Sequence, residues 1–421
     1  MRQRSRAFII AEATSPSSRN AFINAVPVEP STMPGNTTFV AGFTQSNVGD
    51  TSQNTLGAFC ESPGEDYDGL PCDADHSTCG GTVQDCHGRG PGFRISDFES
   101  NRIIGGKQFE GALAVMNGVR NPGIGTVRSV HVYLNTYCLF LTGYSFAGGT
   151  ADGPGAFDFV QGDNSSKSQN AFWELVKGAV TPLPSEDQVA CQYPKPIFID
   201  LQYEKNRCLS IGFPGELTTM AGRRIREALR AKLISSGALG PDAYVVIAGP
   251  ADTYGHYVPT REEYGVQRYE GASTIFGQFT LEAYIDKYSS LVPFLADSTT
   301  GAPASDPAPV DQISNTISLQ SDVVFDAAPI GTTLGDVLVD VNTTPYHAVD
   351  TFSAQFVGAN PRNNLRLESM FLTVDQLVDG QWRTVRSDSH PSTIYQWVRV
   401  STVLGTSTVT ISWQVKDLHD F

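Results

Sequence analysis

The stretch CLSIGFPGELTTMAGRRIREAL, residues 208–229, decides the fold, because it joins a short apolar strand to a helix through a tight turn. Residues 208–213 have the length and apolar content of a buried strand, and a Pro-Gly pair ends it. The pair Thr218–Thr219 can cap a helix that runs through Arg230 and beyond. Glu216 is therefore predicted to lie at a strand-to-helix turn.

The same pattern of strand, polar turn and helix extends outward from this stretch. Residues 196–201 (PIFIDL) and 244–248 (YVVIA) are predicted strands, and a second helix is predicted over 273–291. Open α/β folds place ligands at the carboxyl ends of their strands. We therefore predict a mixed-sheet α/β domain with Ser52, Glu216 and Tyr257 on one rim.

Ser52 lies in the hexapeptide GDTSQN, residues 49–54, which follows the apolar run 39–43 along the chain. A turn at the end of a strand is where a hydrolase places a nucleophilic hydroxyl, so Ser52 is a candidate catalytic residue. Taken alone the motif is weak, because a serine in a Gly-Asp turn is more often a turn partner or a helix cap.

The composition changes abruptly after Phe294, to DSTTGAPASDPAPVD. We predict an incomplete α/β catalytic domain at 1–296, a linker at 297–315 and an incomplete immunoglobulin-like β-sandwich at 316–421. The sandwich prediction rests on alternating apolar and polar residues at 350–358, 369–374, 396–400 and 406–415.

The overall charge narrows the classes of partner. The net charge of −15 over 421 residues argues against nucleic-acid binding, because phosphate backbones repel an acidic chain.

No apolar run reaches the ~18 residues of a membrane span. The apolar run at 7–11 is also too short for a signal peptide, so we expect no export signal in this sequence.

Cysteines and glycosylation sequons nevertheless point to secretion. Four of the seven cysteines, Cys60, Cys72, Cys79 and Cys86, share one Gly/Asp/Pro-rich loop without a C-x-x-C spacing, so two disulfides are favoured over a zinc knuckle. Cys138 and Cys191 are candidates for a third bridge, which leaves Cys208 as a buried thiol. Asn36, Asn164 and Asn342 each begin N-x-[ST].

Six motifs in a fixed order make the chain resemble the neutral, non-lysosomal ceramidases of the secreted type over nearly its whole length. They are GDTSQN at Gly49, STCGG and GPGF in the cysteine loop, GYSFAGGTADG at Gly143, PGELTTMAGRRIREAL at Pro214, TYGHYVPTREEYGVQRYE at Thr253 and FVGANPRN at Phe356. The resemblance implies hydrolysis of the ceramide amide to sphingosine and a fatty acid, with one zinc ion held by two His, one Glu and one Tyr.

The resemblance assigns these roles residue by residue. It implies that Glu216 and Tyr257 are zinc ligands, that Ser52 is the essential serine, and that Tyr269 stabilises the oxyanion. Zinc polarises a carbonyl and a phenol at the developing charge stabilises the intermediate, so these residue types suit amide hydrolysis. Ser52 can either attack the carbonyl or hydrogen-bond to it. The bridges that the resemblance implies are Cys60–Cys79, Cys72–Cys86 and Cys138–Cys191.

The chain also departs from the family pattern. The two His ligands precede the serine motif in the family, whereas residues 1–50 contain no His. Thr51 and Gln53 stand where Val and Pro are usual. We therefore expect a truncated chain whose parent is secreted or displayed at the cell surface, with ceramide as substrate and peripheral contact with a membrane.

Other interpretations stay open. Without His ligands the chain is either a catalytically incompetent sphingolipid-binding fragment or a metal-free serine hydrolase that uses Ser52. The alternative for Glu216 is a favourable charge at a helix start, and for Tyr257 and Tyr269 it is a role as half-buried aromatics. His256 is left out of the predicted site.

Overall fold

The structure is a computed structural model that describes residues 45–93, 95–119, 126–133, 141–165, 170–200, 215–251, 254–308, 323–366, 369–388, 390 and 392–415. The chain divides into two compact units. The first unit contains the described residues up to 308, and the second contains those from 323 onward. The predicted domain bounds, with a linker at 297–315, stay a prediction.

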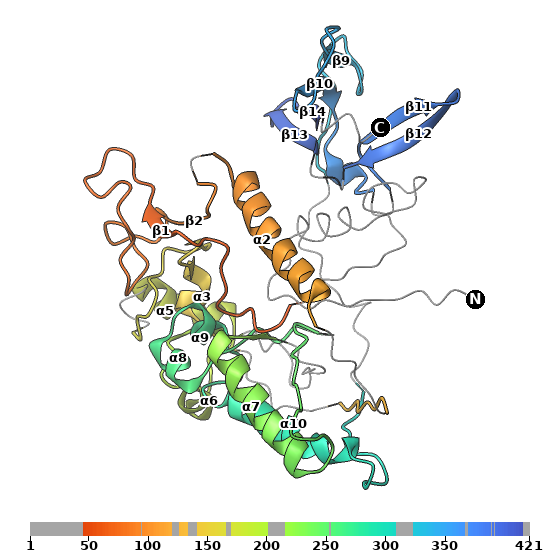
Figure 1. Ribbon diagram of the computed structural model, residues 1–421. Helices are drawn as coiled ribbons and strands as arrows, with labels where there is room; N and C mark the ends of the chain where they lie inside the picture. Colours follow the sequence, from red (N-terminus) through yellow and green to blue (C-terminus); the bar gives the residue numbers. More distant parts are fainter. Residues whose placement is uncertain are drawn as a thin grey trace. The chain divides into compact units, whose positions relative to one another are not determined.

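The first unit mixes helices with short strand pairs (Figure 1). Its helices are α2 (Asp97–Asn117), α3 (Tyr144–Gly148), α5 (Ala171–Val180), α6 (Glu186–Cys191), α7 (Thr219–Ser235), α8 (Arg261–Val266), α9 (Tyr269–Ser273), α10 (Thr280–Leu291) and the 3-10 helix η1 (Val292–Leu295). Antiparallel pairs join β1 (Gly57–Cys60) to β2 (Cys86–Arg89), β3 (Leu141–Gly143) to β6 (Ile197–Asp200) and β4 (Gly149–Thr150) to β5 (Gly153–Pro154). β7 (Glu216–Leu217) and β8 (Tyr257–Val258) pair in parallel.

The α/β character is therefore confirmed, but the described strands form separate two-stranded pieces instead of one continuous mixed sheet. The predicted strand at 208–213 and the apolar run at 39–43 lie outside the described residues. The predicted strand at 196–201 is present as β6.

Helix α7 has the start and the buried face that its sequence predicts. The Thr218 hydroxyl accepts a hydrogen bond from the Ala221 amide at 3.2 Å and so caps the helix. Ile225 is buried in a cluster with Leu281 and Tyr284 of α10, and Leu229 packs against that cluster. The two helices run side by side in Figure 1, so their apolar faces form the core beneath β7 and β8.

Two element predictions in this unit are wrong in detail. Residues 244–248 form no strand, because a ladder needs a partner and none pairs with them among the described residues; Ile247 is still buried in the core cluster. The helix predicted over 273–291 begins only at Thr280. Gly277, with a φ of 85°, separates α9 from α10 by a backbone conformation that no helix continues through.

The second unit consists of antiparallel strands. A four-stranded sheet has the order β13-β14-β10-β9, from β9 (Val337–Val339), β10 (Thr351–Gly358), β13 (Thr393–Ser401) and β14 (Thr406–Gln414). A hairpin joins β11 (Thr373–Val378) to β12 (Gln381–Ser387), and η3 (Pro361–Asn363) follows β10.

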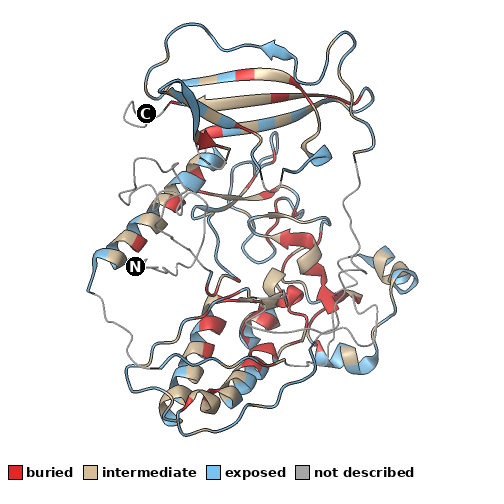
Figure 2. Ribbon diagram, turned by 90° about the vertical axis from the view of Figure 1, so that its right-hand side faces the viewer, coloured by how far each residue is buried: buried red, intermediate tan, exposed pale blue. Residues whose placement is uncertain are grey.

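Three of the four strand predictions in this unit are confirmed, as β10, β13 and β14. The fourth, 369–374, is shifted, since β11 begins at Thr373. Its position is set by the turn Asp379-Gly380, where both φ angles are positive, as a tight two-residue hairpin requires. Along β13, exposed and half-buried residues alternate (Figure 2). The immunoglobulin-like sandwich stays a prediction.

Candidate functional site

The parallel pair β7–β8 sets the two predicted metal ligands side by side. Glu216 lies directly opposite Tyr257 in the register, and the Glu216 amide donates to the His256 carbonyl at 2.8 Å. The next residues along each strand, Leu217 and Val258, are buried in the core cluster. Because side chains alternate along a strand, burying these two neighbours turns Glu216 and Tyr257 to the opposite side.

Two further tyrosines complete this group. The ring of Tyr269, at the start of α9, meets the ring of Tyr257 edge-on, with 5.3 Å between centroids. The Tyr254 hydroxyl donates a 2.6 Å hydrogen bond to Glu216 Oε1. The structure thus brings together Glu216, Tyr257 and Tyr269, and it adds Tyr254, which the sequence analysis missed.

The electrostatics of the group disfavour phenolate. Burial raises the pKa of Tyr257, and the neighbouring charge of Glu216 raises it further. Burial followed by the charge of Glu216 also raises the pKa of Tyr269. A bound cation reverses this tendency, since a positive charge stabilises both the carboxylate and an ionised phenol.

His256 lies beside the group but is engaged elsewhere. Its Nδ1 is 3.0 Å from Ser273 Oγ, and its ring packs edge-on against Phe146 with 5.6 Å between centroids. Burial, and then the charge of Lys195, lowers the pKa of this imidazole. That His256 lies outside the ligand set stays a prediction.

Ser52 is an exposed residue with two hydrogen bonds. Its hydroxyl donates to Asp152 Oδ1 at 2.7 Å and accepts from the Asn54 amide at 2.9 Å. Asp152 belongs to the GYSFAGGTADG motif, about 100 residues away in sequence. The motif alone gave no indication of this contact.

The serine loop is fixed to the end of β7. The Gly49 amide donates to the Leu217 carbonyl at 2.8 Å, and Asp50 Oδ1 accepts from the amide and hydroxyl of Thr219 at 2.6 and 2.8 Å. Three residues of extended chain cover at most about 10 Å, so Ser52 stays close to the strand end that carries Glu216. Turns and a short ladder, rather than a sheet rim, create this proximity.

A side chain at Gly49 would prevent this approach. A Cβ there would lie 2.7 Å from the Glu216 carbonyl oxygen, which is backbone and cannot move aside. The glycine of the GDTSQN motif is therefore required by the contact between the serine loop and β7.

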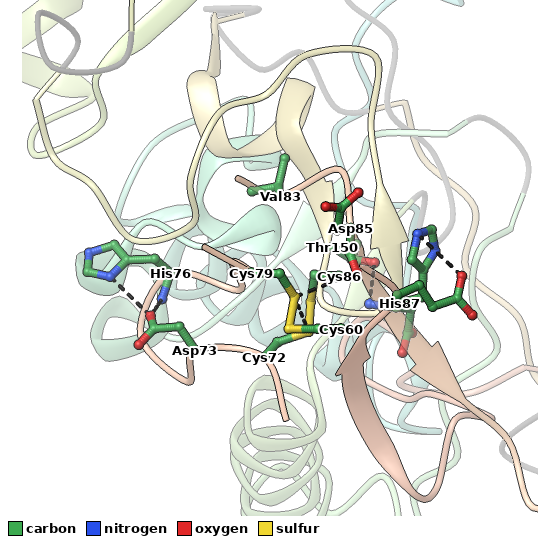
Figure 3. Close-up of a disulfide and its surroundings, with 12 residues drawn as sticks. Cys60, Cys72, Asp73, His76, Cys79, Val83, Asp85, Cys86, His87 and Thr150 are labelled. Atoms are coloured by element: carbon green, nitrogen blue, oxygen red, sulfur yellow. Dashed lines mark hydrogen bonds and ion pairs between the residues drawn. A yellow bond between two sulfur atoms is a disulfide. The ribbon is translucent and has the colours of Figure 1, made fainter. Parts of the chain in front are cut away.

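Two of the predicted disulfides are confirmed. Cys60 is bonded to Cys79 and Cys72 to Cys86, and Figure 3 shows the two bridges next to each other. Cys60 and Cys86 face each other in the β1–β2 register, so the bridges fasten this hairpin to the rest of the loop. Because all four sulfurs are in disulfides, the closely spaced sulfurs do not form a zinc knuckle.

The remaining cysteine and glycosylation predictions are tested only in part. Cys191 is exposed and forms no disulfide with any described residue, while Cys138 and Cys208 lie outside the described residues. Asn164 and Asn342 are exposed, as glycosylation requires. Asn36 lies outside the described residues.

The donor set of the group fits part of a zinc site. Glu216 offers a carboxylate oxygen and Tyr257 a phenol oxygen from adjacent strands, and zinc accepts oxygen ligands at tetrahedral positions. In the described part of the chain, the cystine cluster is the sole group of three closely spaced His, Cys, Asp or Glu ligands. The described residues therefore supply two of the four implied ligands.

Comparison with known proteins covers nearly the whole chain. The model of the N-terminal region of neutral/alkaline non-lysosomal ceramidases matches residues 27–286, and that of the C-terminal region matches 288–420. Neutral ceramidase 2 of Arabidopsis thaliana is 41% identical over 90% of this chain and 54% of its own length. For neutral ceramidase A of Dictyostelium discoideum the identity is 39%, over 92% and 57%.

Solved structures agree with these sequence matches. A ceramidase complexed with C2 superposes with a TM-score of 0.70 at 28% identity, covering 96% of this chain and 60% of the other. Neutral ceramidase from Pseudomonas aeruginosa superposes with a TM-score of 0.67 at 25% identity. The chain spans about half the length of the curated relatives it matches, as the 54% coverage shows.

Proposed function

The chain belongs to the neutral/alkaline non-lysosomal ceramidase family, and on this premise we propose that it is part of a zinc-dependent ceramide amidohydrolase. The reaction is hydrolysis of the N-acyl amide of ceramide to sphingosine and a fatty acid. The observation that carries the proposal is the pairing of Glu216 with Tyr257 across β7 and β8, with the ring of Tyr269 against Tyr257.

In this proposal Glu216 and Tyr257 hold the zinc ion together with two His residues that residues 1–50 do not supply. When bound, zinc polarises the amide carbonyl and lowers the pKa of a bound water to about 7. Tyr269 donates its phenolic proton to the oxygen on which negative charge develops. Its raised pKa keeps that proton in place until the charge forms.

The aromatic surroundings of the group suit a lipid amide. Phe146 packs against Tyr269 with 5.1 Å between ring centroids, and Tyr254 packs against His256 at 5.3 Å. Such rings offer apolar surface to hydrocarbon chains and polar edges to the amide and hydroxyl groups of a sphingoid base. We propose ceramide or a related N-acyl sphingoid lipid as the ligand.

The disulfides support an oxidising compartment for the parent protein, secreted or at the cell surface. Exposed Asn164 and Asn342 are the proposed glycosylation sites. Within the described residues no helix is both long and apolar enough to cross a membrane. Contact with a membrane is proposed as peripheral, because the substrate resides in a bilayer.

The test is hydrolysis of short-chain ceramide by the purified chain, with zinc or with EDTA. Glu216→Ala is expected to abolish EDTA-sensitive turnover and to lower bound zinc, whereas exposed Glu227→Ala on α7 is expected to change neither. Ceramide binding without turnover would favour the sphingolipid-binding alternative. A chain that neither binds nor hydrolyses ceramide would contradict the proposal.

A further inference from the structure

The two disulfides close both ends of one turn, residues 73–78, here called the cystine turn. The Cys72–Cys86 bridge fixes the chain just before the turn, and the Cys60–Cys79 bridge fixes it just after (Figure 3). Backbone hydrogen bonds of 2.9 Å inside the turn hold its shape. Because both of its ends are covalently fixed, the cystine turn is a firm support for any group that binds to it.

Arg268 binds to the backbone of this turn. One terminal nitrogen of its guanidinium donates to the Ala74 carbonyl and, at 3.1 Å, to the Asp75 carbonyl. Arg268 is also the residue that caps the start of α9, where its own carbonyl accepts from the Ala272 amide at 2.8 Å. The start of α9 is therefore tied to a turn that lies 193 residues away in sequence.

A second contact fixes the same place from another side. The Gln161 amide donates to the His76 carbonyl at 3.0 Å, and the next amide, that of Gly162, donates to the Gln267 carbonyl at 3.2 Å. Gln267 is fully buried and ends α8 in the left-handed conformation, with a φ of 55°. The three segments thus bond to one another in a closed set, here called the junction.

Tyr269 follows the junction directly. Its helix, α9, has five residues, too few to hold a position through its own hydrogen bonds. The far end of α9 is fixed by buried Lys195, whose ammonium donates to the Thr274 carbonyl. The position of the near end, which carries Tyr269, is left to the junction.

We propose that Arg268 is a positioning residue for Tyr269, with the cystine turn as the support against which it acts. The disulfides then serve the reaction as well as stability, because they hold the two carbonyls to which Arg268 donates. The part that Tyr269 plays in turnover rests on the proposed function, but its placement by Arg268 needs neither zinc nor ceramide.

The test replaces Tyr269 by a fluorotyrosine in the full chain and records its fluorine NMR resonance without zinc or ceramide. The rings of Tyr257 and Phe146 lie 5.3 and 5.1 Å from the Tyr269 ring, centroid to centroid, so the chemical shift reports where that ring lies. We expect Arg268→Met to displace the resonance. Arg268→Lys keeps a cation that can reach a carbonyl, so it should return the resonance part of the way.

Arg230→Met is the matched control. Arg230 also donates to two backbone carbonyls, those of Ala243 at 3.0 Å and Pro241 at 2.5 Å, but from the second half of α7. It should leave the resonance unchanged. In an active enzyme, Arg268→Met should lower kcat on the order of 10- to 100-fold with little change in KM, because Tyr269 acts in the transition state.

Opening one bridge tests the cystine turn. Cys72→Ser with Cys86→Ser should displace the resonance, and adding Arg268→Met should displace it no further, since both changes act through one contact. Where one of these variants does not fold, Gly162→Ala takes its place. The added Cβ would lie 3.2 Å from the Asp75 carbonyl oxygen at a φ of 72°, and so disturbs the junction from its third segment.

Three results would overturn the inference. They are an unchanged resonance in folded Arg268→Met, an equal displacement in Arg230→Met, and displacements by the bridge and Arg268 variants that simply add. A displaced resonance in a chain that does not hydrolyse ceramide would instead count against the proposed function alone.

Discussion

The Tyr254 hydroxyl donates a 2.6 Å hydrogen bond to Glu216 Oε1, so a residue outside the implied ligand set orients a residue inside it. The bond comes from the loop before β8 and reaches across to β7. A phenol that holds a carboxylate in place fixes the direction of its oxygens before any ligand arrives. Groups that orient metal ligands in this way commonly affect metal affinity strongly.

Removal of the Tyr254 hydroxyl should weaken the proposed binding of zinc at Glu216. Tyr254→Phe keeps the ring but leaves Glu216 free to rotate, so zinc affinity and ceramide turnover are expected to fall by about 10- to 100-fold. Zinc affinity is measured by competition with a chromogenic chelator. Tyr244→Phe, which alters a highly exposed phenol on a neighbouring loop, is the matched control. Equal affinity in the two variants would show that the bond has no role in binding.

Gly49→Ala should detach the serine loop from β7. The added Cβ would lie 2.7 Å from the Glu216 carbonyl oxygen and 2.9 Å from the Leu217 carbonyl carbon. We expect a loss of about 1–3 kcal/mol in the free energy of unfolding. Urea denaturation provides the measurement.

The control for this variant is Gly106→Ala, in the middle of α2, where the added Cβ meets nothing within 4 Å. A helical alanine is better than glycine by about 0.5–1 kcal/mol, so this control is expected to be neutral or stabilising. If Gly49→Ala behaved like the control, the close packing of the serine loop on β7 would be wrong.

Glu270, on α9, should make stability depend on pH. Burial raises the pKa of this carboxyl, and the nearby charge of Asp50 contributes in the same direction. The folded state therefore binds the proton more tightly than the unfolded chain, whose glutamates titrate near pH ~4.3. Stability is highest below that value and falls as the pH rises through the folded pKa.

Glu270→Gln removes the charged form and should raise the urea midpoint at neutral pH. Near pH ~4, where both states are largely protonated, the difference from wild type should vanish. Glu227→Gln, at an exposed position in the middle of α7, serves as the control without a midpoint change. A Glu270→Gln midpoint below wild type at neutral pH would be the opposite of this expectation.

The Cys60–Cys79 bridge should contribute measurably to stability. It joins residues 19 apart in sequence, and closing a loop of this size removes about 3 kcal/mol of chain entropy from the unfolded state. The double substitution Cys60→Ser with Cys79→Ser should lower the free energy of unfolding by that amount. An unchanged denaturation curve would show that this bridge does not stabilise the fold.

Local patterns in the sequence predicted the elements that depend on near neighbours. The threonine cap and the four-residue repeat of apolar side chains predicted α7, and alternating residues predicted β10 and β14. The secondary-structure predictions failed where residues outside the local pattern decide whether an element forms. Residues 244–248 have the composition of a strand but no ladder partner among the described residues, and Gly277 interrupts the predicted helix at 273–291.

For the candidate site, the sequence motifs were sufficient to identify the residue types and the family. The GDTSQN, PGEL and YGHY motifs specify Ser52, Glu216 and Tyr257, because each motif carries its turn chemistry and its functional side chain together. The cysteine loop likewise indicated two disulfides, since its spacing favours disulfides over a zinc knuckle and the resemblance gave the pairing.

Which of these residues contact one another is seen only in the folded structure. Tyr254 reaches Glu216 over 38 residues of sequence, and Ser52 reaches Asp152 over 100, through contacts that no local periodicity encodes. The physical reason is that a hydrogen bond needs its two atoms within about 3 Å. For segments this far apart in sequence, that proximity is set by the packing of β7, β8 and the braced β1–β2 hairpin.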